Sequence, residues 1–213
     1  VKGYKMLFYV LCISLLVSVA CTGSPCTDGF PKTYVTHKLA SDEKIVIDGK
    51  LDDDGWEHVE WTNYFIDIIN DTLPTPRFKT RAKMRWDDSF LYVGAHLEEN
   101  QIWSYIAWDN GAQDRAIFAD NDFEVFVDSD GSFHWYKEFE MNGLNHTMNL
   151  GMDKPYIDGG NYNMNGPEAH KGLKCAPYFS GMVLNKPDPA RDVKNSFWSV
   201  EVRLPLHYLV TNK

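Results

Sequence analysis

The sequence is poor in cysteine, in positive charge and in long apolar runs. None of its four cysteines stands at CxxC spacing, which argues against a zinc site of that type. Its 21 lysines and arginines are outnumbered by 30 aspartates and glutamates, and the formal net charge is -9. This balance argues against a nucleic acid or an anionic membrane as a partner, because both bind a basic face.

The patterns of a membrane span, a helical protein or a familiar enzyme are also absent. Downstream of residue 30 there is no apolar run of about 18 residues, so the mature chain is not expected to insert into a membrane. No segment keeps the helical period of about 3.6 residues, and there is no P-loop, HExxH motif or nucleophile elbow. The 213 residues are 44% hydrophobic and 14% aromatic, which excludes global disorder and suffices for one domain with a sizeable core.

Residues 1–20 have the composition of a signal peptide. Lys2 and Lys5 precede an apolar run that ends at Ala20, and Ser18 and Ala20 are the small residues that a cleavage site requires. We therefore expect a secreted or extracytoplasmic protein, with an uncleaved anchor as the alternative. Residues 21–32 are interpreted as a linker and residues 33–213 as the folded module.

Cysteine usage agrees with export. Cys12 leaves with the signal, and an odd number remains: Cys21, Cys26 and Cys175. Cys21 follows a sequence like a lipobox in which Ser18 replaces the usual leucine, so lipoprotein anchoring at Cys21 is one expectation. A disulfide from Cys175 to Cys26, or alternatively to Cys21, is the other.

The region after residue 33 has the pattern of β-structure. Residues 78–86 alternate between apolar and basic side chains, Asp87-Asp88-Ser89 predicts a turn, and residues 90–97 alternate again, which together predict a hairpin. Residues 198–204 predict a last strand whose Trp198, Val200, Val202 and Leu204 face inward while Ser199, Glu201 and Arg203 face outward.

A second hairpin is predicted around the segment Asp128–Gly131. Its strand 123–127 alternates, and a turn at 129–131 would pair Val127 with Phe133 and Val125 with Trp135. In this register Glu124 lies opposite Tyr136.

We expect four tryptophans in the core: Trp56, Trp86, Trp135 and Trp198. Asp53–Trp61 allows one helical turn, and 157–167 reads as a long loop. The whole predicts an all-β antiparallel sandwich, jelly-roll-like, in one domain.

Several phrases resemble the family 9 carbohydrate-binding modules and the wider group of DOMON-like sandwiches. Five of them occur in the family's order over about residues 33–210: Ile47–Asp52 with Trp56, Trp86–Asp88 with Leu91–Val93, Asp120–Asp128, Tyr136–Asn142 and Trp198–Val202. The resemblance implies a β-sandwich that binds sugars, often carries structural calcium, and is commonly attached to xylanases and other polysaccharide hydrolases.

The resemblance also implies site residues. Glu124 matches the family's sugar-binding glutamate, and Phe118 stands where the family has the first of two clamping tryptophans. The second clamping ring falls beyond Lys213 in the family pattern, so a truncated module or a fragment is expected. A carboxylate accepts two sugar hydroxyls while an aromatic ring covers the apolar sugar face. The candidate sugar-binding residues are Glu124, Phe118, Trp103, Arg115 and Asn121, with Trp108 as a further candidate ring.

Acidic residues gather on the face of the second predicted hairpin. Asp120, Asp122, Glu138 and Glu140 share it, and carboxylates this close raise one another's pKa unless a base or a cation intervenes. Arg81, Arg85, Arg115 or Arg203 is one source of neutralisation, and structural calcium is the other. The candidate metal ligands are Asp120 and Asp122 on this face, with Asp128 and Asp130 at the nearby turn as a second candidate site.

The sequence thus predicts a non-catalytic module that binds a polysaccharide or oligosaccharide of the glucan or xylan type, as part of a system for carbohydrate catabolism. No cofactor other than calcium is expected. Two alternatives remain, a glycoside hydrolase that uses a pair of these carboxylates and an interaction sandwich that does not bind sugar.

Overall fold

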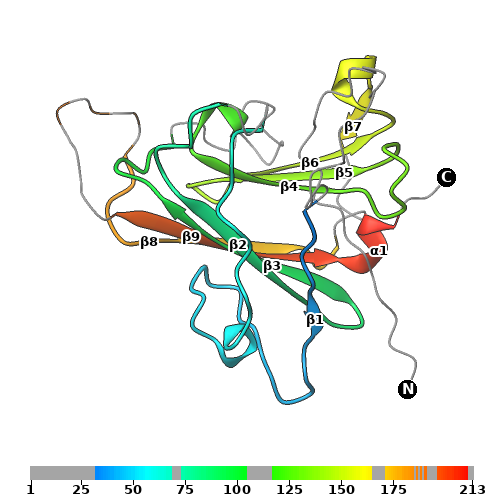
Figure 1. Ribbon diagram of the computed structural model, residues 1–213, viewed down its shortest axis with the longest axis horizontal. Coiled ribbons are helices and arrows are strands. Elements are labelled where there is room, and N and C mark those ends of the chain that lie inside the picture. The colour runs from blue at the N-terminus through cyan, green and yellow to red at the C-terminus, as the bar shows by residue number, and fades with distance from the viewer. Residues whose placement is uncertain are drawn as a thin grey trace, which may run out of the picture.

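The computed structural model describes residues 32–68, 73–104, 117–164, 171–184, 186, 188, 190 and 196–210. The predicted signal peptide, most of the linker, Cys21, Cys26, Trp108 and Arg115 lie outside the described residues. Two sheets are stacked face to face, so the described part has the predicted β-sandwich fold (Figure 1). Among the described residues, no helix is long and apolar enough to cross a membrane.

The first sheet has five strands in the order β1-β2-β3-β9-β8. Its strands are β1 (His37–Lys38), β2 (Thr80–Trp86), β3 (Phe90–Glu98), β9 (Phe197–Pro205) and β8 (Lys174–Phe179). The second sheet has four strands in sequence order, β4 (Asp122–Val127), β5 (Lys137–Asn142), β6 (Thr147–Met152) and β7 (Tyr162–Met164). All neighbours are antiparallel except β1 and β2. The helical pieces are η1 (Asp54–Trp56), η2 (Ile117–Ala119), η3 (Tyr156–Asp158) and α1 (Leu206–Leu209).

The predicted hairpin 78–86/90–97 is confirmed as β2 and β3. Ala82 pairs with Ala95 and Met84 with Val93, so the small and apolar residues share the inner face. The turn is held locally, because the Asp87 carboxylate accepts hydrogen bonds from the backbone N–H groups of Ser89 at 2.7 Å and Phe90 at 2.8 Å.

The core lies between the sheets. From the first sheet it takes the inner face of the predicted last strand, Trp198, Val200, Val202 and Leu204, all buried. From the second sheet it takes Phe123, Val127, Phe139 and Met141. Alternation with period two places these side chains on one face of each sheet, which confirms the predicted inward set of β9.

The predicted second hairpin is wrong in register. β5 begins at Lys137 rather than Phe133, and Glu124 pairs with Glu140 instead of lying opposite Tyr136. Phe133 and Trp135 have positive φ angles, are 47% and 48% exposed, and belong to a long connecting loop. Trp135 is therefore not a core residue. Trp56 and Trp198 are buried as predicted, and Trp86 is partly buried against the core.

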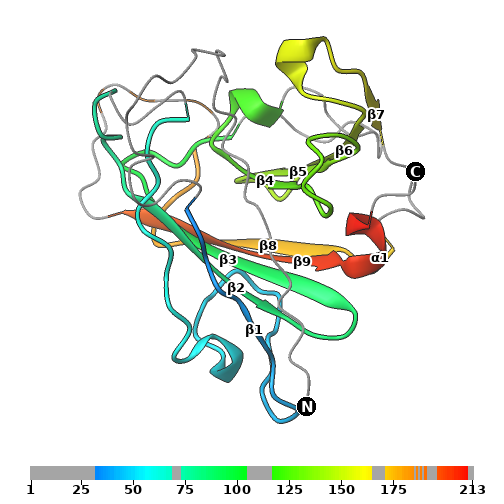
Figure 2. The same ribbon diagram turned by 45° about the vertical axis from the view of Figure 1, so that its right-hand side comes forward.

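Ser199 and Glu201 lie on the outer face of the first sheet as predicted, but this face is covered and both are buried. The segment around η1 packs on this face, on the side away from the second sheet (Figure 2). Glu201 is 0% exposed and accepts hydrogen bonds from the Trp56 indole at 2.7 Å and from the backbone N–H groups of Asp48 and Gly49 at 2.8 Å each. The helical turn predicted within Asp53–Trp61 is η1.

Cys175 lies on β8 as a free thiol whose Sγ is 3.2 Å from Oδ1 of Asn145. Burial raises the pKa of this thiol to about 12, so it is not a reactive thiolate. Because Cys21 and Cys26 lie outside the described residues, the disulfide stays a prediction.

Candidate functional site

The predicted acidic face is the outer face of the second sheet. Residues two apart in a strand point to the same side, so Asp122 and Glu124 of β4 share this face. Glu138, Glu140 and Asn142 of β5 join them, because the register pairs Glu124 with Glu140 and Asp122 with Asn142. The face opposite to the core therefore carries a line of carboxylates along two neighbouring strands.

Apolar and phenolic side chains cover part of this face. Ile117 of η2 packs on Met148 and Leu150 of β6, and all three are buried. Tyr156 of η3 donates a hydrogen bond from its hydroxyl to Oε2 of Glu138 at 2.8 Å. The cover buries Glu138 and Glu140, whereas Glu124 remains exposed. The carboxylate line thus runs from a buried end to one that solvent can reach.

Asp122, Glu124 and Glu140 form a tight trio. One carboxylate oxygen from each residue lies within 4.8 Å of the others. Burial, followed by the neighbouring Glu124, raises the pKa of Asp122 to about 8. Burial, followed by a hydrogen bond with Glu138, raises the pKa of Glu140 to about 9. Burial also raises the pKa of Glu124, although its hydrogen bond with Asp122 acts in the opposite direction.

The trio therefore needs protons or a cation at neutral pH, because three adjacent carboxylates in a partly desolvated place repel one another. Three of the four arginines expected to neutralise it do not lie there, and the fourth, Arg115, is outside the described residues. Among the described ones, Arg85 pairs with Glu43, the Arg203 guanidinium donates to the Gly172 carbonyl, and Arg81 stacks on Trp61. All three are on the first sheet.

The predicted sugar-binding residues divide into two groups. Glu124 is exposed on β4, and Phe118 presents a ring that is 62% exposed from η2, which packs on β4 and β5. Asn121 instead stabilises the segment that follows β3. Its Oδ1 accepts a hydrogen bond from the Trp103 backbone N–H at 2.7 Å, and its Nδ2 donates one to Glu99 at 3.3 Å. Trp103 is half-buried and bridges to Leu184. Arg115 lies outside the described residues.

The predicted metal ligands are also separated. Asp128 follows the far end of β4 and accepts the backbone N–H groups of Gly131 at 3.1 Å and Phe133 at 2.7 Å. Asp130 accepts the N–H of Ser132 at 3.0 Å. These carboxylates order the connecting loop at the opposite end of β4 from Asp120 and Asp122.

Asp120 does lie near the acidic face but serves a different role from the trio. It is buried, and its Oδ2 accepts a hydrogen bond from Nδ2 of the fully buried Asn142 at 3.0 Å. The predicted ligands include Asp122 but neither Glu124 nor Glu140, although alternation places Glu140 on the same acidic face. Glu140 becomes the cross-strand partner of Glu124 only in the observed register.

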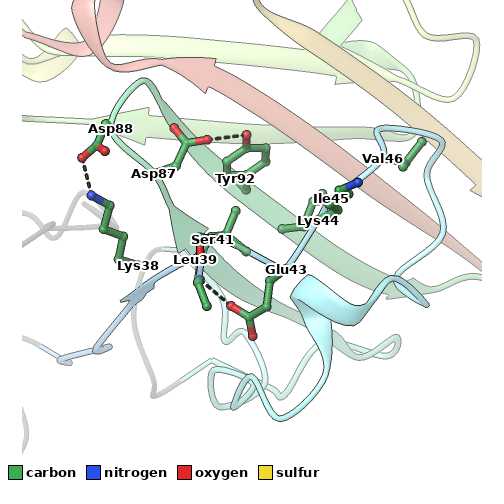
Figure 3. A pocket seen from close by; sticks show the side chains of 11 residues that line it. Lys38, Leu39, Ser41, Glu43, Lys44, Ile45, Val46, Asp87, Asp88 and Tyr92 are labelled. Carbon is green, nitrogen blue, oxygen red and sulfur yellow. Dashed lines mark hydrogen bonds and ion pairs between the residues drawn. The ribbon is translucent and has the colours of Figure 1, made fainter.

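The described surface has a hollow at the edge of the acidic region and a larger one near β1. A hollow of about 240 Å³ is lined by residues that include Asp120, Asn121 and Asp122, together with the strand ends at Thr80 and Trp198. The larger one, of about 670 Å³, lies near β1 (Figure 3). In its lining, Lys38 pairs with Asp88 and the Tyr92 hydroxyl donates a hydrogen bond to Asp87 at 2.8 Å.

Comparison with known proteins identifies one family. The model described as "Carbohydrate family 9 binding domain-like" matches residues 47–175. A search of curated proteins finds no match.

Among solved structures, two of a family 9 carbohydrate-binding module from Caldicellulosiruptor kristjanssonii are similar to this chain. The complex with cellotriose has 18% identity, covers 80% of this chain and 66% of that chain, and has a TM-score of 0.44. The complex with glucose has 17% identity, covers 80% of this chain and 69% of that chain, and has a TM-score of 0.42. A Bacteroides uniformis protein described in terms of carbohydrate binding has 14% sequence identity to this chain. The match covers 71% of this chain and 62% of that chain, with a TM-score of 0.49. The chain thus spans about two thirds of the length of each.

Proposed function

The chain belongs to the carbohydrate family 9 binding domain-like family, a family of non-catalytic binding domains, and from this premise we propose that it binds a glucan- or xylan-type saccharide through Glu124 and Phe118. The observation that supports the proposal is the exposed carboxylate of Glu124 on β4 together with the exposed ring of Phe118 on η2, which packs on that strand. The ligand is a saccharide of a polysaccharide-degrading system.

The two side chains supply complementary interactions. A sugar ring has apolar C–H faces, and an exposed phenyl ring offers contact area for one of them at little cost in conformational entropy. A carboxylate accepts hydrogen bonds from two neighbouring hydroxyls, and such charge-assisted bonds are stronger than neutral ones. With one ring and a few hydrogen bonds, each contributing about 1 kcal/mol, the dissociation constant should lie near the millimolar range.

Replacing Glu124 by alanine is expected to weaken binding of cellobiose and xylobiose at least about tenfold, because hydrogen bonds to a charged group contribute about 1.5–3 kcal/mol. NMR titration of the full chain measures this effect. Phe118→Ala should weaken binding about fivefold through the loss of stacking, about 1 kcal/mol.

Two variants serve as matched controls. Glu57→Ala removes an exposed carboxylate beside η1, and Phe133→Ala removes an exposed ring from the loop after the far end of β4. Both should leave the dissociation constant unchanged. Binding that is equal in the wild type and in Glu124→Ala would show that the saccharide site is elsewhere.

Export is part of the same proposal, since a polysaccharide is an extracytoplasmic ligand. It is supported by the basic start, the apolar run and the small residues that end at Ala20. N-terminal sequencing of material from the producing cells should find a mature chain that begins at or near Cys21. Recovery of the intact Met6–Ala20 stretch in the mature protein would contradict export by cleavage.

A further inference from the structure

The trio of Asp122, Glu124 and Glu140 has the geometry of a ligand set for a hard cation. Oxygens that coordinate one Ca²⁺ lie about 2.3–2.6 Å from the ion, so two of them are at most about 5 Å apart. In the trio, one oxygen from each carboxylate lies within 4.8 Å of the others. All three side chains project from neighbouring strands of one rigid sheet, which holds them in place without the aid of the ion.

A second observation concerns the deepest member of the trio. Glu140 is 2% exposed, yet its Oε2 has no hydrogen-bond partner, and the buried Oδ2 of Asp122 has none either. A buried carboxylate oxygen without a donor is costly, and a bound water or ion is one of the explanations for such a group in a native protein. These oxygens belong to two members of the trio, so a single ion that the trio bound through them would satisfy both.

The open end of the cluster faces solvent. Glu124 is exposed, so an ion held by the trio would be shielded by β5 on one side and accessible on the other. Ca²⁺ takes six to eight oxygen ligands. Three carboxylates do not fill that number unless all bind through both oxygens, which leaves positions for water or for two neighbouring hydroxyls of a sugar.

We propose that Asp122, Glu124 and Glu140 bind a divalent cation of the calcium type and that saccharide hydroxyls complete its coordination, so that saccharide binding depends on the cation. The inference rests on the proposed saccharide function and changes how Glu124 acts in it. The glutamate holds the ion, and the ion contacts the hydroxyls. The sequence prediction placed calcium either on the acidic face of Asp120, Asp122, Glu138 and Glu140 or at the Asp128/Asp130 turn. The proposed site lies on that face and adds Glu124.

The first test uses the metal alone. The full chain, stripped with EDTA and dialysed, is titrated with Ca²⁺ by calorimetry, and saturable binding of about one ion per chain is expected. Glu140→Gln keeps the shape of the side chain but removes one charge, and it should weaken Ca²⁺ at least tenfold. Glu57→Gln, an equivalent change at an exposed site, should leave it unchanged.

Mn²⁺ locates the ion without any variant. As a paramagnetic probe added below one equivalent, it should broaden the backbone NMR signals of Asp122, Glu124 and Glu140 before those of other residues. Broadening centred on the loop at Asp128 and Asp130, or no Ca²⁺ binding at all, would overturn the proposal.

The second test titrates cellobiose and xylobiose into the same protein, once in excess Ca²⁺ and once in EDTA. Binding in Ca²⁺ with at least a tenfold loss in EDTA supports the proposal. Equal binding in the two buffers overturns it and leaves the proposed saccharide function intact. Saturable Ca²⁺ binding without saccharide binding in either buffer overturns the coupling and shows that the saccharide function itself is wrong.

Discussion

Replacing Glu201 by alanine should destabilise the fold by about 3–5 kcal/mol, because it leaves three buried donors without an acceptor at about 1–3 kcal/mol each, partly offset by relaxation. The donors are the Trp56 indole and the backbone N–H groups of Asp48 and Gly49, at 2.7–2.8 Å. These hydrogen bonds attach the covering segment, residues 48–57 around η1, to the centre of β9. Burial raises the pKa of Glu201 although all three donors act to lower it, which shows how strongly this carboxyl is desolvated.

Urea denaturation followed by tryptophan fluorescence measures the loss in the free energy of unfolding. Glu201→Gln should lose less, because one oxygen acceptor remains. Glu57→Ala, at an exposed position of the same covering segment, should change stability by no more than about 0.5 kcal/mol. A loss below about 1 kcal/mol in Glu201→Ala would mean that the covering segment is not held through this carboxyl.

Gly49→Ala should destabilise the protein by about 2–5 kcal/mol, from a left-handed backbone strain of about 1–2 kcal/mol and a steric clash of about 1–3 kcal/mol. Gly49 has φ of +87°, and a Cβ there would lie 2.5 Å from the carbonyl carbon of Pro177 and 2.6 Å from the nitrogen of Tyr178. These are backbone atoms of β8, so the strand itself must move.

Gly159→Ala separates the two contributions. Its φ is +71°, but a Cβ would meet no atom within 4 Å, so it should lose only the strain. Thermal unfolding of both variants under the same conditions provides the comparison. Equal losses in the two would show that the close approach of Gly49 to β8 adds nothing to the backbone strain.

The hairpin of β2 and β3 and the inner face of β9 could be predicted because their determinants are local. Alternation with period two assigns each side chain to a face, and Asp87 orders the turn through the N–H groups of its immediate neighbours. The five short sequence stretches that resemble the family 9 modules are also local features of the sequence.

The register of β4 and β5 could not be predicted in this way. Phe133 and Trp135 are spaced like strand residues, but Asp128 accepts the N–H of Phe133 and both aromatic residues take positive φ angles in a loop. A strand pairing that starts four residues later places Glu140 rather than Tyr136 beside Glu124. The acidic trio therefore exists only in the observed register.

Alternation in the sequence determined which side of its sheet each strand residue occupies, and hence the β-sandwich and its core. Only the tertiary structure decided what lies on the other side. Glu201 is on the outer face as predicted but is fully buried, because the segment around Trp56 covers it. Glu140 is on the outer face too, buried under η2 and η3 and their neighbours beside two other carboxylates. The physical reason is that periodicity reflects the local pleat of one strand, whereas cover and charge clustering depend on segments distant in the chain.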